Sequence, residues 1–440
     1  MKKLSIALAV IIVILGLALR IFLYPSLPIL NGFAAKALCS CVFVANIPED
    51  VAREGEAGFF PISLASTAVD YDRKMATANF FGLVEKNAYY REGQGCAIFN
   101  KMEAPKPPKG LSGVVSQDTL QLESNLLSTS QNQNLEAAID WAFTEDDPTN
   151  PAKRTRGVAI MYKGKLVAER YAEGFGPDSR MLGWSMTKSI TSVLYGLLAK
   201  DSILDRNDEV NSSKWPIKEK VTYTDLLQMS SGMEWDENYG TMSAVTKMLY
   251  AADTFGAVVG TYPITAEPGS TWYYSSGTTN LLTYLLADFF PSKQEYLEFP
   301  EKGLFDRIGM NSMVVETDAS GHFVGSSYGW ATPRDWARFG QMMLDEGVVN
   351  GDTIVTKEWV DFCKTPASAS DGLYGGQFWL NASGQMPDAP RDAYSARGFH
   401  GQRVEIIPSK DLVIVRLGVT HVRGAFDFNE WTAKVVAALE

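Results

Sequence analysis

Ser185 and Lys188 are the residues of this sequence that most directly indicate covalent chemistry. They stand three positions apart at the start of an apolar stretch, and residues three apart on a helix share one face. A serine hydroxyl is a weak nucleophile until a base takes its proton, and a lysine can be that base where burial lowers its pKa. The first turn of a helix also offers free N–H groups that can stabilise an oxyanion. The pair therefore predicts a nucleophile and its base, although a surface lysine after an ordinary serine has the same spacing.

A second candidate element is the segment 272–277, Trp-Tyr-Tyr-Ser-Ser-Gly, which lies at a turn before a predicted helix. Tyr274 in such a turn can reach a cleft, and its phenol can relay protons if its pKa is lowered. The alternative is an aromatic ring that packs at the helix start, which is the commoner role of a single tyrosine.

A third candidate element is the segment 396–402, Ala-Arg-Gly-Phe-His-Gly-Gln, which leads into a strand-like stretch. Its glycines would let a substrate lie close to the strand edge. His400 could donate a hydrogen bond to a bound carbonyl or carboxylate, and Arg397 could bind a carboxylate. A tight turn with solvated polar side chains accounts for the same residues equally well.

Ser327 is a rival nucleophile, because residues 325–329 match the pattern Gly-x-Ser-x-Gly. In an α/β-hydrolase that turn directly follows a buried strand. Here a polar stretch, 318–322, precedes it with only two residues between, and the alternation of parallel strands and helices is missing. Ser327 is therefore expected to line the cleft and not to attack the substrate.

The elements that must position these residues begin near residue 135. Helical spacing or helix-start residues predict helices over 135–143, 185–200, 224–230, 277–289, 333–345 and 426–439. Strand-like runs cover 157–162, 166–171, 403–407 and 412–419, and a hairpin turn joins the first two. Thr332 and Pro333 are residues typical of a helix start and predict the beginning of the helix at 333. We predict an α+β fold: an antiparallel β-sheet closed by early and late strands, flanked by helices, with an inserted mainly helical subdomain.

The N-terminus carries a different signal. Two lysines precede an apolar run over residues 4–19, which Arg20 interrupts and residues 21–24 continue. The stretch 4–23 is close to the roughly 20 residues that a spanning helix needs. This predicts a single transmembrane helix with its N-terminus inside and the rest of the chain outside, and a cleaved signal peptide is the rival interpretation. We expect an anchor or signal over 1–25, an N-terminal extension and linker over 26–132, and a hydrolase domain over 133–440. Within the extension, residues 77–90 favour extended structure, and 101–134 have linker composition.

Composition excludes several classes of function. The formal net charge is −11, the pI is about 5.0 and no basic stripe is present, so nucleic acid is not an expected partner. The three histidines do not stand at metal-ligand spacing, and neither a metal nor an organic cofactor is predicted. Of the four cysteines, Cys96 could pair with Cys39 or Cys41 outside the cytoplasm, while buried free thiols including Cys363 explain the sequence equally well.

With its three candidate elements in this order, the sequence resembles the class C β-lactamase and penicillin-binding esterase superfamily. It is most similar to the 6-aminohexanoate-dimer hydrolase branch, over roughly residues 135–440. The resemblance implies a β-lactamase/transpeptidase-like fold in which Ser185 is acylated, while Lys188 and Tyr274 share proton transfer. It places Ser276 where an asparagine is usual, gives half of the oxyanion hole to the Ser185 N–H, and sets the segment with Arg397, His400 and Gly401 on the opposite, substrate-binding wall.

The sequence also departs from that family. Ser-Asp-Asn is absent, and the near match to Lys-Thr-Gly at 364–366 precedes the expected strand, which weakens a β-lactamase assignment more than it weakens hydrolysis. We therefore expect a serine hydrolase of small amide, ester or peptide substrates. It would be held in the inner membrane by one helix, with the catalytic domain on the periplasmic or extracytoplasmic side. The alternative is a non-hydrolytic protein that binds penicillin or cell-wall peptide.

Overall fold

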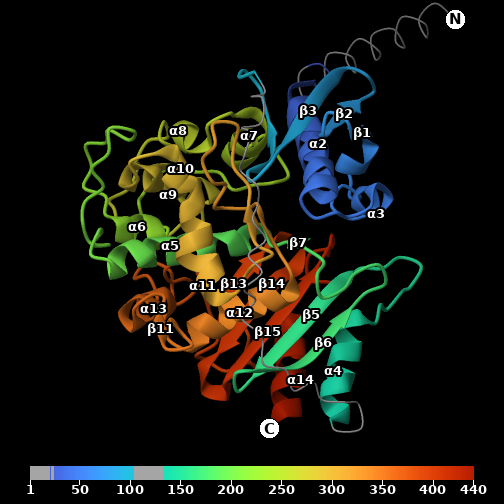
Figure 1. The fold of residues 1–440 in the computed structure, drawn as a ribbon, viewed down its shortest axis with the longest axis vertical. Helices are drawn as coiled ribbons and strands as arrows, with labels where there is room; N and C mark the ends of the chain where they lie inside the picture. The colour runs from blue at the N-terminus through green and yellow to red at the C-terminus, as the bar shows by residue number, and fades with distance from the viewer. Residues whose placement is uncertain (1–19, 21–23, 104–131) are drawn as a thin grey trace, which may run out of the picture.

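The computed structural model describes residue 20 and residues 24–103 and 132–440 of the chain, and Figure 1 shows its architecture. A six-stranded antiparallel sheet with the order β12-β13-β14-β15-β5-β6 forms the centre of the C-terminal part. Its strands are β5 (Thr155–Tyr162), β6 (Lys165–Tyr171), β12 (Trp379–Leu380), β13 (Tyr394–Gly398), β14 (Gln402–Ile407) and β15 (Leu412–Gly418). Early and late strands therefore meet in one sheet, because β15 pairs with β5, and this confirms the predicted closure.

The two predicted hairpins fold as local units. Lys163 and Gly164 both have positive φ between β5 and β6, which is the two-residue turn geometry that suits the twist of a hairpin. A short turn at residues 408–411 joins β14 and β15. β5 and β15 are buried along almost their whole length, because helices cover both faces of the sheet.

Helices from the two ends of the domain cover one face of this sheet. α4 (Gln133–Phe143) and α14 (Phe428–Leu439) pack against each other and against β5, with Ile139, Val158 and Trp431 in their shared core. α12 (Pro333–Leu344) covers the other face. Thr332 caps α12 by accepting from the Asp335 N–H, as the sequence predicts.

The remaining helices form the predicted insert between β6 and the late strands, seen at the left of Figure 1. Its helices are η4 (Trp184–Met186), α5 (Thr187–Lys200), α6 (Tyr223–Leu227), α7 (Ala244–Ala251), α8 (Phe255–Val259), α9 (Ser276–Leu286), η5 (Ala287–Phe289), α10 (Lys293–Pro300), η6 (Glu301–Phe305), α11 (Asp306–Ile308) and α13 (Lys357–Lys364). Two small sheets complete it: β7 (Met181–Leu182), β9 (Gly329–Ala331) and β8 (Val314–Val315) in one, β10 (Val348–Val349) and β11 (Asp352–Thr353) in the other.

Residues 24–103, the N-terminal unit, form a sheet and helices of their own. The antiparallel sheet β1-β2-β3-β4 consists of β1 (Ser66–Asp70), β2 (Met75–Phe80), β3 (Val84–Arg91) and β4 (Gly95–Ile98). The helical elements are η2 (Tyr24–Ser26), α2 (Leu27–Phe43), α3 (Glu49–Glu54) and η3 (Ile62–Leu64). The extended structure expected over 77–90 is thus confirmed. The Cys39–Cys96 disulfide ties α2 to β4, while Cys41 and Cys363 are buried free thiols.

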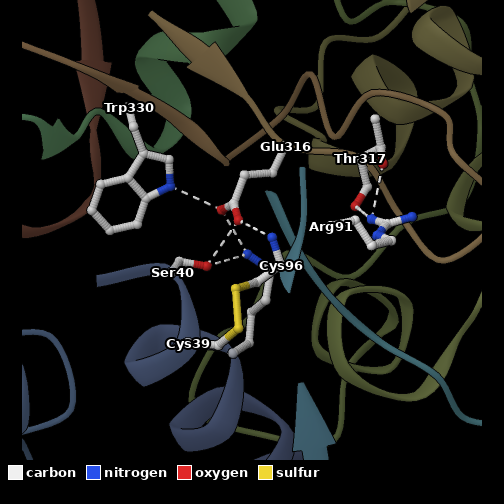
Figure 2. The surroundings of a disulfide bond; sticks show 8 residues. Cys39, Ser40, Arg91, Cys96, Glu316, Thr317 and Trp330 are labelled. Carbon is white, nitrogen blue, oxygen red and sulfur yellow. Dashed lines mark hydrogen bonds and ion pairs between the residues drawn. A yellow bond between two sulfur atoms is a disulfide. The ribbon is translucent and has the colours of Figure 1, made fainter. Parts of the chain in front are cut away.

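A buried ion pair joins the N-terminal unit to the rest of the molecule. Lys36 of α2 donates to Glu316 at 2.7 Å, and both side chains are almost completely buried. Figure 2 shows the same carboxylate accepting from Ser40, from the Cys96 N–H and from the Trp330 indole, at 2.9, 2.6 and 2.8 Å. α2 and the hydrolase part also share one hydrophobic core. The unit is therefore packed into the molecule as part of its core.

α2 bears on the expected membrane anchor. Together with η2 it spans 20 residues of mean hydropathy 1.4, long and apolar enough to cross a bilayer. Most of this stretch is buried by protein, and it carries Lys36 in its ion pair and Cys39 in its disulfide. The hydropathy of α2 thus follows from its place in the core. Apart from Arg20, the predicted anchor at 4–23 lies outside the described residues, as does most of the predicted linker.

Candidate active site

Ser185 lies in η4, the tight turn that leads directly into α5. Trp184 has a φ of 48°, an uncommon conformation for a bulky residue that turns the chain sharply before the helix. The Thr187 hydroxyl donates to the Trp184 carbonyl at 2.7 Å and accepts from the Gly329 N–H at 2.9 Å. The Gly183 N–H in turn donates to the Gly329 carbonyl at 2.8 Å. Strand β9 therefore holds the turn that presents Ser185.

Lys188 lies one turn further into α5 and is 1% exposed. Its ammonium nitrogen is 2.9 Å from the Ser185 Oγ, 3.0 Å from the Ser276 Oγ and 2.9 Å from the Ser326 carbonyl oxygen. All three partners are neutral oxygens. Burial lowers the pKa of Lys188 to about 8, while the nearby charge of Glu237 acts in the opposite direction. A lysine in this state can both hold and accept a proton near neutral pH.

Tyr274 completes the group from the loop before α9, where Ser275 caps the helix by accepting from the Thr278 N–H. The phenol of Tyr274 forms a hydrogen bond with Ser185, and its ring centroid is 4.8 Å from the Lys188 nitrogen. Burial raises the pKa of Tyr274 well above its usual value. The sequence argument required a lowered pKa for a proton relay, and the structure corrects it, because burial favours the neutral phenol.

Glu237 is the site residue that sequence reasoning missed. It accepts from the Ser276 N–H at 2.8 Å, from the Ser276 hydroxyl at 2.5 Å and from the Trp235 indole at 2.6 Å. Ser276 therefore stands between the carboxylate and the Lys188 ammonium, donating to one and accepting from the other. The only available signal was an acidic residue between two aromatic residues, because nothing local places this loop beside residue 276.

Arg397 lies on β13 beside the aromatic wall of the site. Its guanidinium stands over the Trp379 ring at 5.6 Å, and that ring packs at 5.1 Å from Tyr274. Its Nε donates to Ser395 at 2.8 Å, while Nη2 is buried with no hydrogen-bond partner in the described part of the chain. One N–H group of Arg397, the predicted carboxylate-binding residue, therefore has no acceptor among the described residues.

His400 and Gly401 lie at the end of β13, on the side of Trp184. The His400 ring packs against Phe399 at 4.0 Å, His421 at 4.9 Å, Phe59 at 5.3 Å and Trp184 at 6.0 Å. Burial lowers its pKa well below its usual value, so the ring is neutral. The Gly401 carbonyl accepts from the buried Arg416 at 2.9 Å. His400 thus packs against Trp184, next to Ser185, and Gly401 contacts Arg416 of β15.

The Ser327 segment forms the wall behind Lys188. Ser326 and Ser327 are buried, and their hydroxyls lie 2.8 Å apart. Ser327 also forms a hydrogen bond with Tyr239, a neutral phenol, while the carbonyl of Ser326 accepts from Lys188. The side-chain partners of Ser327 are hydroxyls, whereas Ser185 also contacts an amine that can take its proton.

The structure thus brings together Ser185, Lys188, Tyr274 and Ser276. The model of the family described as Beta-lactamase matches residues 142–438, about two thirds of the chain. This chain belongs to the β-lactamase family. It is a hydrolase of amide or ester bonds, as the sequence resemblance implied.

Individual relatives in the family are distant. A 6-aminohexanoate-dimer hydrolase from Paenarthrobacter ureafaciens is 24% identical over 290 residues, which cover 60% of this chain and 72% of that protein. The structure of a candidate 6-aminohexanoate-dimer hydrolase from Bacillus anthracis has a TM-score of 0.58 at 22% identity, covering 73% of this chain and 86% of that one. A family VIII carboxylesterase has a TM-score of 0.56 at 15% identity, with 72% and 98% covered. These structures share the α+β fold of this β-lactamase family member.

Proposed function

We propose that the chain is a serine hydrolase that cleaves a small amide or ester through an acyl-enzyme on Ser185. The observation that carries this proposal is the 2.9 Å contact between the Ser185 hydroxyl and the amine of Lys188, whose pKa burial lowers to about 8. At pH 7 about a tenth of such an amine is neutral, which suffices for a general base.

In the acylation step the neutral Lys188 amine takes the Ser185 proton while the oxygen attacks the substrate carbonyl. The negative charge that develops rests on the Ser185 N–H and on a second backbone N–H at the end of β13. That strand end passes so close to the Ser185 turn that a Cβ on Gly398 would lie 2.1 Å from the Gly183 carbonyl. The neutral phenol of Tyr274 then protonates the leaving nitrogen or oxygen and is reprotonated by Lys188.

Deacylation follows the same path in reverse. Water enters in place of the leaving group, loses its proton to the same pair of groups and attacks the ester of Ser185. Glu237 acts through Ser276: it keeps that hydroxyl turned so that its oxygen accepts from Lys188. No step requires a metal or an organic cofactor.

Arg397 and the relatives support a substrate class. Arg397 supplies a buried, unpartnered donor on the wall beside Tyr274, which fits the carboxylate of a short linear amide or peptide. The relative from Paenarthrobacter ureafaciens is named for the hydrolysis of such an amide dimer. The absence of Ser-Asp-Asn and of Lys-Thr-Gly at the strand disfavours β-lactams as substrates. His400 and Gly401 would support this wall from behind.

We also propose that the apolar stretch 4–23 anchors the enzyme in the inner membrane, with the catalytic domain on the periplasmic side. The two lysines before the stretch favour this orientation. The Cys39–Cys96 disulfide supports it independently, because disulfides persist in oxidising compartments.

Turnover of nitrophenyl esters and of short linear amides by the purified full-length protein tests the proposal. The wild type and Ser327→Ala should turn over at least one substrate, and Ser185→Ala should not. A protein that binds the same compounds through an intact Ser185 without releasing product would instead be the non-hydrolytic binder. Loss of turnover in Ser327→Ala with retention in Ser185→Ala would reverse the assignment of the nucleophile.

A further inference from the structure

The two ends of the N-terminal sheet differ in character. The β2–β3 turn is formed by Phe81, Gly82 and Leu83, and no charged residue occurs from 75 to 84. The opposite end carries the β1–β2 and β3–β4 turns. Its charged residues are Asp70, Asp72, Arg73, Lys74, Arg91 and Glu92, and the exposed Tyr71 lies among them. The β2–β3 turn itself is therefore apolar, with Glu85 and Lys86 following it on β3, whereas the turns at the opposite end are charged.

The apolar side chains at the first end point into solvent. Phe81 is 73% exposed and Leu83 is 60% exposed, whereas Phe80 beside them is buried. Gly82 at the tip has no neighbouring side chain or backbone within 4 Å of where a Cβ would stand. Within the fold the Phe81 ring contacts only the edge of Phe80 among the described aromatic rings, at 6.1 Å, so most of the apolar surface of this tip stays exposed.

Phe81 is an unusual residue for the backbone geometry of this turn. The Leu83 N–H donates to the Phe80 carbonyl at 3.0 Å, and both central residues have positive φ, 53° at Phe81 and 68° at Gly82. Asparagine, aspartate or glycine is favoured at the first central position of such a turn, and a bulky side chain there is an outlier. The contact of the Phe81 ring with Phe80 leaves 73% of the residue exposed, and a contact outside the fold would explain a bulky side chain at this position.

The position of the β2–β3 turn in the molecule indicates what Phe81 could contact outside the fold. The Asn31 amide donates to the Val84 carbonyl at 2.6 Å, and the Phe43 ring lies 6.0 Å from Tyr90 at the other end of the strand. From 90 to 84 the strand advances about 20 Å, and from 43 to 31 the helix advances about 18 Å, so β3 and α2 run side by side. The turn beyond Val84 therefore lies level with the start of α2, in the part of Figure 1 where α2 and β3 lie together.

The start of α2 is also where the apolar stretch 4–23 joins the described chain. Tyr24 at this point is 53% exposed, and α2 carries no charge before Lys36. Aromatic side chains are enriched at the membrane–water interface, because the ring suits the boundary between lipid tails and headgroups. The turn and Tyr24 thus form one exposed aromatic end of the molecule next to the segment proposed to enter the bilayer.

We propose that Phe81 and Leu83 insert into the interfacial layer of the lipid bilayer beside the anchor, with Tyr24 at the same depth. This inference rests on the proposed N-terminal anchor and adds a second membrane contact that fixes how the hydrolase stands over the bilayer. Two protruding side chains on a hairpin tip suit a soft lipid surface. They fall far short of the roughly 800 Å² per partner that a stable protein interface buries.

The test places an environment-sensitive fluorophore on the hairpin of the full-length protein. Leu83→Cys is labelled and reconstituted in vesicles of phosphatidylethanolamine and phosphatidylglycerol, and Asp72→Cys at the charged end is the matched control. The native free thiols Cys41 and Cys363 are buried, which favours labelling at the new site. We expect a blue-shifted emission at position 83 that brominated lipids quench, and an unshifted, unquenched emission at position 72.

Each other outcome overturns the inference in a recognisable way. If the protein stays with the vesicles through alkaline extraction while label 83 emits as in water, the anchor stands and the hairpin contact is wrong. A blue shift that brominated lipids do not quench would mean that protein covers the turn. Release of the chain from the vesicles would remove the anchor and this contact together.

A second variant separates the membrane role from a role in folding. Phe81→Asn places a favoured residue in the turn, so the folded protein should be as stable as the wild type or more so. In vesicles, Phe81→Asn combined with Leu83→Cys should lose most of the quenching by brominated lipids. Unfolding at lower denaturant with unchanged quenching would show that the ring serves the fold.

Discussion

Lys36 and Lys188 are both buried, as is Lys153 in the described part of the chain, and the surroundings of the first two differ in one respect. Lys36 joins the N-terminal unit to the hydrolase part through a direct ion pair with Glu316 at 2.7 Å. Lys188 contacts only neutral oxygens, and its nearest carboxylate, Glu237, is reached through the hydroxyl of Ser276. Burial lowers the pKa of both side chains.

The distance to the nearest carboxylate distinguishes a structural lysine, Lys36, from a lysine that can act as a base, Lys188. A carboxylate in direct contact keeps Lys36 charged and fixed, because separating the pair in the interior is costly. A carboxylate one hydroxyl away stabilises the charged form of Lys188 less, so its pKa falls to about 8 and the proton can leave. The same side chain therefore serves two purposes according to where its counter-charge lies.

Removal of the amine from the catalytic site should have the largest effect. Lys188→Met should lower kcat/KM by about 10²- to 10⁴-fold, the usual contribution of a general base. The loss of stability should be smaller than for Lys36, because no charge is left unpaired in direct contact. Steady-state ester hydrolysis and denaturant unfolding of the same preparation measure both quantities. Activity retained in Lys188→Met would contradict the difference drawn between the two lysines.

The opposite pattern is expected at the structural lysine. Lys36→Met leaves the Glu316 carboxylate buried without its cation and should cost about 3–5 kcal/mol in the free energy of unfolding. The activity of the molecules that remain folded should be unchanged. Adding Glu316→Gln should restore part of the stability, since the amide still accepts a hydrogen bond and carries no charge. A double variant no more stable than Lys36→Met would show that charge is not the cause.

The disulfide tests how strongly the N-terminal unit is held. It closes a chain segment with a sequence separation of 57, and Cys39→Ser should lower stability by about 2–4 kcal/mol. The matched control is Cys41→Ser, which changes a buried free thiol two residues further along the same helix and should cost less. Unfolding monitored by tryptophan fluorescence, with and without reductant, compares them. Equal losses in the two variants would argue against a role for the bond.

The smallest expected effect is a shift in pH dependence. The rate should rise with pH through about 8, as Lys188 loses its proton and becomes a base. The negative charge of Glu237 favours the charged lysine, so Glu237→Gln should lower the pKa and move this rise to lower pH. The pH profile of kcat/KM for both proteins measures the shift. A rise displaced to higher pH would mean that Glu237 does not act on Lys188 by its charge.

The features that the sequence predicted are those that depend on the spacing of residues close together in the chain. Ser185 and Lys188 share a helix face by their separation alone, and each hairpin of the main sheet is contiguous in the chain. The closure of the sheet by early and late strands also followed, since those hairpins were the main strand-like runs of the domain. Strand β13 was not expected, although the residues at its end were chosen as site candidates.

The features of the site that the sequence did not predict depend on contacts between residues far apart in the chain, which no local sequence pattern indicates. Glu237 acts through a residue 39 positions away, and the Ser326 partner of Lys188 is a backbone carbonyl that any residue would supply. The direction of the Tyr274 pKa shift depends on burial among rings from distant segments. The sequence likewise left open which cysteine pairs with Cys96, because Cys39 and Cys41 differ only in the helix face that turns toward β4.

The most direct test of the account is the rate at which Ser185 is acylated on either side of pH 8. A slowly deacylating ester or a fluorophosphonate is added to the full-length enzyme, and peptide mapping by mass spectrometry locates and quantifies the adduct. We predict one adduct, on Ser185, that forms faster as the pH rises through about 8 and is slowed strongly in Lys188→Met. An adduct on Ser327, or a rate that does not depend on Lys188, would contradict the account.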